Sequence, residues 1–259
     1  MSPALTILTF HALDDARAVI SFSPALFERL VRVLRAGGYQ VLSLADAAVD
    51  LRHGVAFPVR SLAITFDDGY RSVYQTAFPI LREHAMPATV FLTVGDPEQA
   101  SWRGAGDPSA RLPSLEGRPM LSWGEIREMQ RGGMNFGAHT LTHPDLTLLP
   151  LSSIQREMVA SKAVLEETLG APVAGFAYPS GRYDARSLQL ARQHFAYAVS
   201  DRLGFAYPGS DIHALPRVDG YYLGHPRLLD LLAKPWFPWY IRACSVPRIA
   251  RREMLRLLR

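Results

Sequence analysis

Short apolar runs alternate with helical patterns about seven times along this chain, and the alternation constrains the fold more than any other feature. The runs are rich in β-branched and aromatic residues, as buried strands are. Strands joined by helices in this way usually pair in parallel, with the helices packed against the sheet. The sequence therefore predicts an α/β fold, with strands expected at residues 5–10, 39–42, 61–66, 88–93, 135–138, 175–178, 197–200 and 213–218.

Capping residues mark the ends of several expected helices. Ser23 followed by Pro24 is typical of a helix start, and Gly37 is expected to end that helix. Pro79 should interrupt or kink another helix. The helices are expected over residues 24–36, 45–51, 72–84, 122–131, 152–169, 184–194 and 227–233. Residues 95–119, rich in glycine, proline and charge, form a segment of a length that is usually a functional or a disordered loop.

Composition and cysteine content restrict the class of protein. The chain has 259 residues, of which 48% are hydrophobic and 20% charged, as in ordinary globular proteins. A single cysteine, Cys244, excludes a disulfide framework and a multi-thiolate metal site. No run approaches the roughly 20 apolar residues of a membrane span, and the first residues lack the pattern of a secretory signal. A cytoplasmic location is therefore expected.

The positive charge is concentrated at the end of the chain. Residues 234–259 contain seven Lys and Arg and one acid, a net charge of +6, so residues 1–233 carry −2 of the overall +4. The positive charge that gives the high pI is thus local, and it does not predict a nucleic-acid partner. We divide the chain into a body, residues 1–233, and a basic, aromatic tail, residues 234–259. The tail could bind an anionic membrane on its cytoplasmic face, or pack on the body as a terminal helix with a solvated basic face.

Asp67 and Asp68 directly follow an expected apolar strand. Repulsion between two adjacent carboxylates raises the pKa of one of them, and a bound cation would relieve that repulsion. Neighbouring strand residues point to opposite faces, but Gly69 permits a turn after them. One Asp could then ligate a metal while the other accepts a proton. Taken alone, the pair could equally be a helix cap or a turn.

His139 and His143 provide the further ligands that such a cation needs. They are four residues apart, so a helical turn or a tight loop would point both imidazoles the same way. Two histidines and one aspartate suit zinc or a similar divalent ion and leave a position open for water or substrate. Taken alone, the two histidines could be a surface pair. In a closed barrel, active-site residues gather at the carboxyl ends of the strands, where we expect His11, Asp67, Asp68, His139, Ser180 and His213.

Three motifs in this order resemble the polysaccharide deacetylase superfamily, the NodB-homology domain of carbohydrate esterase family four. They are Thr-Phe-Asp-Asp-Gly at 65–69, His-Thr-Leu-Thr-His at 139–143 and Ala-Tyr-Pro-Ser-Gly-Arg-Tyr-Asp at 177–184, and the likeness covers roughly residues 5–220. Thr-Phe-His at 9–11 and Leu-Pro-Arg-Val at 215–218 resemble the branch that includes poly-N-acetylglucosamine deacetylases. The resemblance implies a distorted (β/α)7, TIM-like barrel with one divalent metal ion, zinc in preference to cobalt, nickel or iron.

The resemblance also implies roles for the motif residues. Asp68, His139 and His143 resemble the family's metal ligands, and Asp67 resembles its general base. Amide hydrolysis suits these residues, because it needs a polarised carbonyl and an activated water molecule. The turn at Pro179, Ser180 and Gly181, next to Tyr178, is expected to line the substrate pocket and to aim the Ser180 backbone N–H at the developing oxyanion.

Two departures from the family pattern leave roles open. The Arg that braces the base in the family's third motif is absent from residues 176–179, and we expect Arg217, rather than Arg182, to replace it. An ordinary structural salt bridge is the alternative for Arg217. The family's Asp-x-x-Asp-Trp motif and its leucine-rich strand ending in His are also absent. We favour His213 as the general acid and His11 as a pocket residue, although either could be a histidine satisfied by its neighbours.

These observations predict a metal-dependent hydrolase that removes N-acetyl groups from an amino sugar. The substrate would be a polysaccharide, an oligosaccharide or a lipid-linked glycan precursor. One alternative is a glycan-binding barrel that keeps the metal without catalysis, and another is a deacylase of O-acyl esters or non-sugar amides. Trp102 could stack on a sugar ring, whereas Trp123, at helical spacing, is expected in the core.

Overall fold

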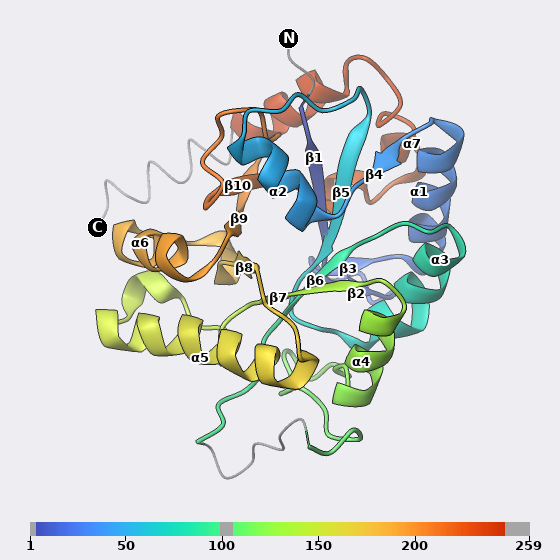
Figure 1. Cartoon of the computed structure of the whole chain (residues 1–259). Helices are drawn as coiled ribbons and strands as arrows, with labels where there is room; N and C mark the ends of the chain where they lie inside the picture. Colours follow the sequence, from blue (N-terminus) through green and yellow to red (C-terminus); the bar gives the residue numbers. More distant parts are fainter. Residues whose placement is uncertain (1–3, 99–105, 247–259) are drawn as a thin grey trace.

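Seven parallel strands close into a barrel in the computed structural model, which describes residues 4–98 and 106–246 (Figure 1). The barrel closes because β1 pairs with both β5 and β10. Around it the order is β1 (Thr6–Phe10), β5 (Ser61–Phe66), β6 (Thr89–Leu92), β7 (Asn135–Ala138), β8 (Gly175–Ala177), β9 (Tyr197–Leu203) and β10 (Leu215–Asp219). The short β4 (Gln40–Val41) pairs with the start of β5, and β2 (Ala12–Leu13) with β3 (Ser21–Phe22). The predicted (β/α)7 barrel is confirmed.

The helices begin and end close to where the capping residues predict. They are α1 (Pro24–Ala36), α2 (Leu44–Arg52), α3 (Phe78–Glu83), α4 (Trp123–Arg131), α5 (Leu151–Leu169), α6 (Ala185–His194) and α7 (Pro226–Leu229). Ser122 and Glu125 form a reciprocal capping box at α4, and Asp184 caps α6. Pro79 does interrupt its helix: Val73–Ala77 is π-helical, and the Phe78 N–H bonds the Val73 carbonyl just before the proline.

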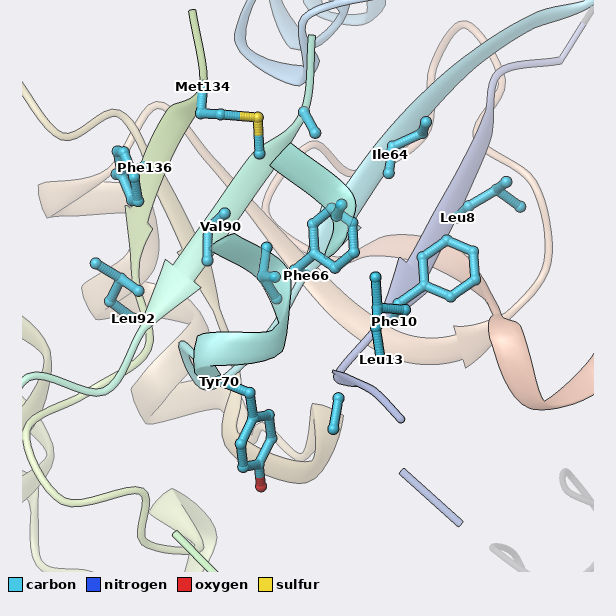
Figure 2. Close-up of a cluster of buried hydrophobic side chains, with 14 of the residues drawn as sticks. Leu8, Phe10, Leu13, Ile64, Phe66, Tyr70, Val90, Leu92, Met134 and Phe136 are labelled. Atoms are coloured by element: carbon cyan, nitrogen blue, oxygen red, sulfur yellow. The ribbon is translucent and has the colours of Figure 1, made fainter. Parts of the chain in front are cut away.

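Alternate residues of each strand pack on opposite sides of the barrel wall. Leu8, Phe10, Ile64, Phe66 and Val90 face outward, where they join one hydrophobic cluster with residues of α1, α3 and α4 (Figure 2). Their neighbours in the strands fill the interior together with residues of α2, and this second cluster includes Ile7, Ala63, Phe91, Ala177, Val199 and Leu215. This period of two decides which side chains can reach the inside of the barrel at its carboxyl end.

The long segment after β6, where it is described, packs against the carboxyl end of the barrel. Backbone bridges join Tyr70 to Met120 and Arg111 to Ser122, and Leu112 and Leu121 are buried there. Trp102, the residue considered for sugar stacking, lies outside the described residues. Trp123 is fully buried, as expected of a core residue.

The tail packs on the barrel as far as it is described. Residues 237–246 are helical, Phe237 and Ile241 are buried, and the Phe237 ring contacts Phe205 at a centroid distance of 6.0 Å. Among the helices that the structure describes, none is both long and apolar enough to cross a membrane.

Candidate metal centre

Three inward-facing strand positions carry polar side chains to the carboxyl end of the barrel. On β5 the inward series of Ala63 and Thr65 continues to Asp67, whose N–H still bonds the Phe10 carbonyl of β1 at 3.0 Å. By the same alternation His139 follows Gly137 and Arg217 follows Leu215. The barrel therefore brings together groups that are up to 150 residues apart in the chain.

Asp67 and Arg217 form a buried, bidentate ion pair. Arg217 donates from Nη1 to Asp67 Oδ1 at 2.8 Å and from Nη2 to Oδ2 at 2.6 Å, and both residues are 3% exposed. Further donations to Thr9 Oγ1 and the Ser200 carbonyl fix the guanidinium. Burial alone would raise the pKa of Asp67, but the Arg217 charge holds it well below its usual range. Arg217 thus occupies the bracing position that the sequence predicted for it.

Asp68 points to a different partner because the chain turns immediately after Asp67. Asp68 has φ +73° and Gly69 has φ +95°, and the Gly69 N–H bonds the Asp67 carbonyl at 2.9 Å. Asp68 Oδ1 then lies 3.4 Å from His139 Nε2 and 3.5 Å from His143 Nε2. One ligand atom from each of these three residues lies within 4.8 Å of the others. The predicted ligands therefore converge on one point.

The donor atoms of this cluster fit a divalent cation. Asp68 Oδ1 is buried and accepts no hydrogen bond from the described residues, which is unfavourable for a carboxylate without a cation. His139 Nδ1 lies 2.8 Å from the Ala177 carbonyl, which fixes Nδ1 as the protonated nitrogen and leaves Nε2 as a ligand. Burial lowers the pKa of His139, but contact with Asp68 and Asp67 outweighs this and raises it. A bound metal would take the place of the second proton, the one that Nε2 carries in the charged ring.

The segment between the two histidines is a tight loop that a buried glutamate holds in place. Glu157 of α5 accepts hydrogen bonds from the Leu141 and Thr142 N–H groups at 2.8 and 3.0 Å and from Thr142 Oγ1 at 2.7 Å. His143 itself has φ +59°, and such a conformation needs support from its surroundings. Sequence reasoning missed Glu157. Its one signal is an acid on the buried face of α5, next to Met158.

Tyr70 is a second residue that the motifs did not single out. Its side chain is buried, and burial, followed by the nearby charges of Asp68 and Glu116, raises its pKa well above the usual value. The tyrosine is therefore a neutral hydroxyl beside the carboxylate.

Two further predicted residues lie at this end of the barrel. His11 follows β1, and its Nε2 is 3.9 Å from Asp67 Oδ2 with 24% of the side chain exposed. Ser180 is exposed in the turn after β8 and has φ +52°. Pro179 and Gly181 build that turn, and a Cβ on Gly181 would lie 2.2 Å from the Asp201 backbone. Gly181 therefore allows β9 to approach, which is a packing requirement at this position.

Two other predicted residues are not brought to this site. His213 precedes β10, at the amino end of the barrel, and its Nε2 lies 3.0 Å from the Phe195 carbonyl. It lies four positions before Arg217, about 13 Å along an extended chain, so it is not part of this site and does not fit the predicted role of general acid. Tyr178 follows the inward Ala177 and so points outward, where its ring packs against Tyr183 and its hydroxyl donates to the His213 carbonyl at 2.9 Å.

Arg182, the alternative brace for Asp67, is also engaged elsewhere. Its Nη1 donates to Asp145 Oδ2 at 2.8 Å on the surface. The contact ties the turn after β8 to the loop that carries His143.

Replacing Glu157 by Gln should weaken metal binding without removing a ligand. The amide keeps one acceptor oxygen, so three donors lose charged partners, and we expect a loss of roughly 1–3 kcal/mol of stability. Titration of the apoprotein with Co²⁺, followed by visible absorption, should show a larger dissociation constant than for the unchanged protein. Glu167, an exposed acid on the same helix, provides the control Glu167→Gln. Equal affinities of the two variants would contradict the role of Glu157.

Comparisons with known proteins agree with this geometry. The family model described as polysaccharide deacetylase matches residues 54–199. The poly-beta-1,6-N-acetyl-D-glucosamine N-deacetylase of Staphylococcus aureus is 26% identical over 222 residues, 81% of this chain and 67% of that protein. The Streptococcus pyogenes deacetylase PplD, solved with acetate, superposes with a TM-score of 0.76 at 27% identity, covering 91% of this chain and all of that one. For IcaB of Ammonifex degensii the TM-score is 0.74 at 26% identity, with 90% and 97% covered. This chain belongs to the polysaccharide deacetylase family.

Proposed function

We propose that this protein is a metal-dependent hydrolase that removes N-acetyl groups from an amino sugar within a glycan. The observation that carries the proposal is the convergence of Asp68, His139 and His143 next to the ionised Asp67. The named activity of the Staphylococcus aureus relative, which acts on poly-β-1,6-N-acetylglucosamine, supports an N-acetylated polysaccharide or oligosaccharide as substrate.

A single divalent ion held by Asp68, His139 and His143 would polarise the acetyl carbonyl and increase the acidity of a neighbouring water molecule. Two nitrogen ligands and one oxygen ligand suit zinc, and also cobalt, nickel or iron. The remaining chemistry belongs to the side chains around this centre.

Asp67 is proposed to accept the proton from the attacking water. It is ionised and lies beside the ligand cluster, yet Arg217 makes it a weak base. Arg217 uses one lone pair on each Asp67 oxygen, so the carboxylate keeps acceptor capacity toward the water. Its main contribution is therefore position and orientation. A carboxylate that is already held in one place loses less conformational entropy when it reaches the geometry for proton transfer.

The leaving amine needs a proton when the C–N bond breaks, and His11 is the proposed donor. It is partly exposed at the carboxyl end of the barrel and close to Asp67, whereas His213 is at the opposite end. The Ser180 backbone N–H, on the turn after β8, is proposed to stabilise the oxyanion that forms as water attacks the carbonyl. The products would be acetate and a free amino sugar.

The buried ion pair favours an enzyme over a glycan-binding barrel that kept only its metal. A binding protein needs the three ligands, but it has no use for a fourth, desolvated carboxylate held ionised beside them. Burying the Asp67–Arg217 pair is energetically demanding, and such pairs are often no more stabilising than apolar packing.

Asp67→Asn should abolish turnover while leaving the ligand cluster intact. We expect acetate release from N-acetylglucosamine oligomers to fall by about 10²–10⁴-fold, because the base is lost, and Co²⁺ binding to persist. Addition of a chelator should abolish the activity of the unchanged protein, and re-addition of metal should restore it. Metal binding by the unchanged protein without release of acetate from any N-acetylated sugar would contradict the proposal. Release from O-acetyl substrates alone would also contradict it.

Paired substitutions of two histidines test the assignment of the acid. His11→Asn should lower kcat by about 10²–10⁴-fold, with its largest effect on substrates that have a basic leaving amine. The matched change His213→Asn removes a histidine at the other end of the barrel and should leave kcat within a few-fold of the original. Loss of activity in His213→Asn but not in His11→Asn would contradict the assignment of His11.

A further inference from the structure

The tail helix lies at the end of the barrel opposite the metal centre. Thr6 and Ser61, the first residues of β1 and β5, line one cavity of about 560 Å³ together with Lys234 and Phe237 of the tail. In Figure 1 the red tail helix lies above the amino ends of β1 and β5, and the described parts of the loop after β6 lie at the other end. Residues 234–246 of the tail are therefore separated from the metal ligands by the length of the barrel.

The tail helix presents its largest apolar side chains to solvent. Trp239 is 64% exposed and Val246 63%, and Trp236, in the turn that precedes the helix, is 50% exposed. The spacing of these three residues continues along one side of the helix. The opposite side, with Phe237 and Ile241, is buried in the body. The barrel thus anchors this helix while the two tryptophans are left outside the core.

Cations accompany these tryptophans. The Arg242 guanidinium lies 5.6 Å from the Trp239 ring centre, and Lys234 precedes Trp236. Residues 231–246 contain no Asp or Glu, and residues 234–259 carry a net +6. Tryptophan and basic residues together on one side of a helix match the polar–apolar boundary of an anionic bilayer, where indole rings lie among the headgroups and cations meet lipid phosphates.

We propose that the exposed face of the tail helix, formed by Trp236, Trp239, Arg242 and Val246, docks this protein on an anionic lipid surface. Charge complementarity favours this partner over a second copy of the chain, because two copies would bring their basic tails together. Binding should combine insertion of the two indoles with attraction between the tail and anionic headgroups, and the second contribution should weaken in high salt.

Docking through this face has a consequence for the substrate, which rests on the proposed function. Strands of five or six residues span about 17–20 Å, so the metal centre would lie at least one barrel length from the lipid. The active site would then act on a glycan that extends away from the bilayer, and not on a sugar joined directly to a lipid headgroup.

Vesicle co-sedimentation of the full chain tests the proposal. Vesicles of phosphatidylcholine with about 30% phosphatidylglycerol, an anionic lipid of the kind that attracts basic segments, are compared with pure phosphatidylcholine at low and high salt. We expect binding to the anionic vesicles only, and a loss of about tenfold or more in Trp236→Ser/Trp239→Ser, because two apolar contacts are removed. The control Leu148→Ser/Leu151→Ser removes two residues that are 68% and 53% exposed elsewhere and should bind as the unchanged protein does.

Three outcomes would overturn the proposal: no binding to anionic vesicles at low salt, binding that the double tryptophan change leaves unaltered, or self-association that this change abolishes. Acetate release from a soluble oligosaccharide is measured on the same samples. It should be equal in the unchanged protein and the Trp236→Ser/Trp239→Ser variant. Failure of membrane docking is thereby distinguished from failure of the proposed activity.

Discussion

Two adjacent buried carboxylates need two separate cations, and the rest of the site follows from that requirement. Asp67 is neutralised by Arg217 through two hydrogen bonds of 2.8 and 2.6 Å. Asp68, only 6% exposed, pairs with no Lys or Arg among residues 4–98 and 106–246: its Oδ1 meets His139 and His143 instead. Since an unpaired buried charge is strongly destabilising, the two aspartates cannot exchange roles. One is held by protein, and the other is available to a metal ion.

The period of two in the strands accounts for most of the site, and it is readable in the sequence. Inward positions on β5, β7 and β10 end in Asp67, His139 and Arg217, and motif resemblance identified the same residues. The same period argues against Tyr178 as a pocket residue, because its neighbour Ala177 faces inward. Strict use of the alternation places the Tyr178 side chain on the outside of the barrel from the sequence alone.

His213 shows that the direction of a strand must be used together with its position. The expected strand of residues 213–218 begins at His213, so that strand already places the histidine at an amino end. In the structure β10 begins at Leu215, where pairing with β9 starts, and His213 precedes it. Glu157 was missed for another reason: two of its partners are backbone N–H groups of a loop, so the sequence shows only an acid among the buried positions of α5.

Anomalous diffraction from crystals grown with Zn²⁺ or Co²⁺, recorded at the metal's absorption edge, would test this division of roles most directly. The account predicts one strong peak within ligand distance of Asp68, His139 and His143, about 2.0–2.2 Å for nitrogen and oxygen donors, with Asp67 still paired to Arg217. A peak coordinated by Asp67 with Arg217 displaced, or no peak between the two histidines, would contradict it.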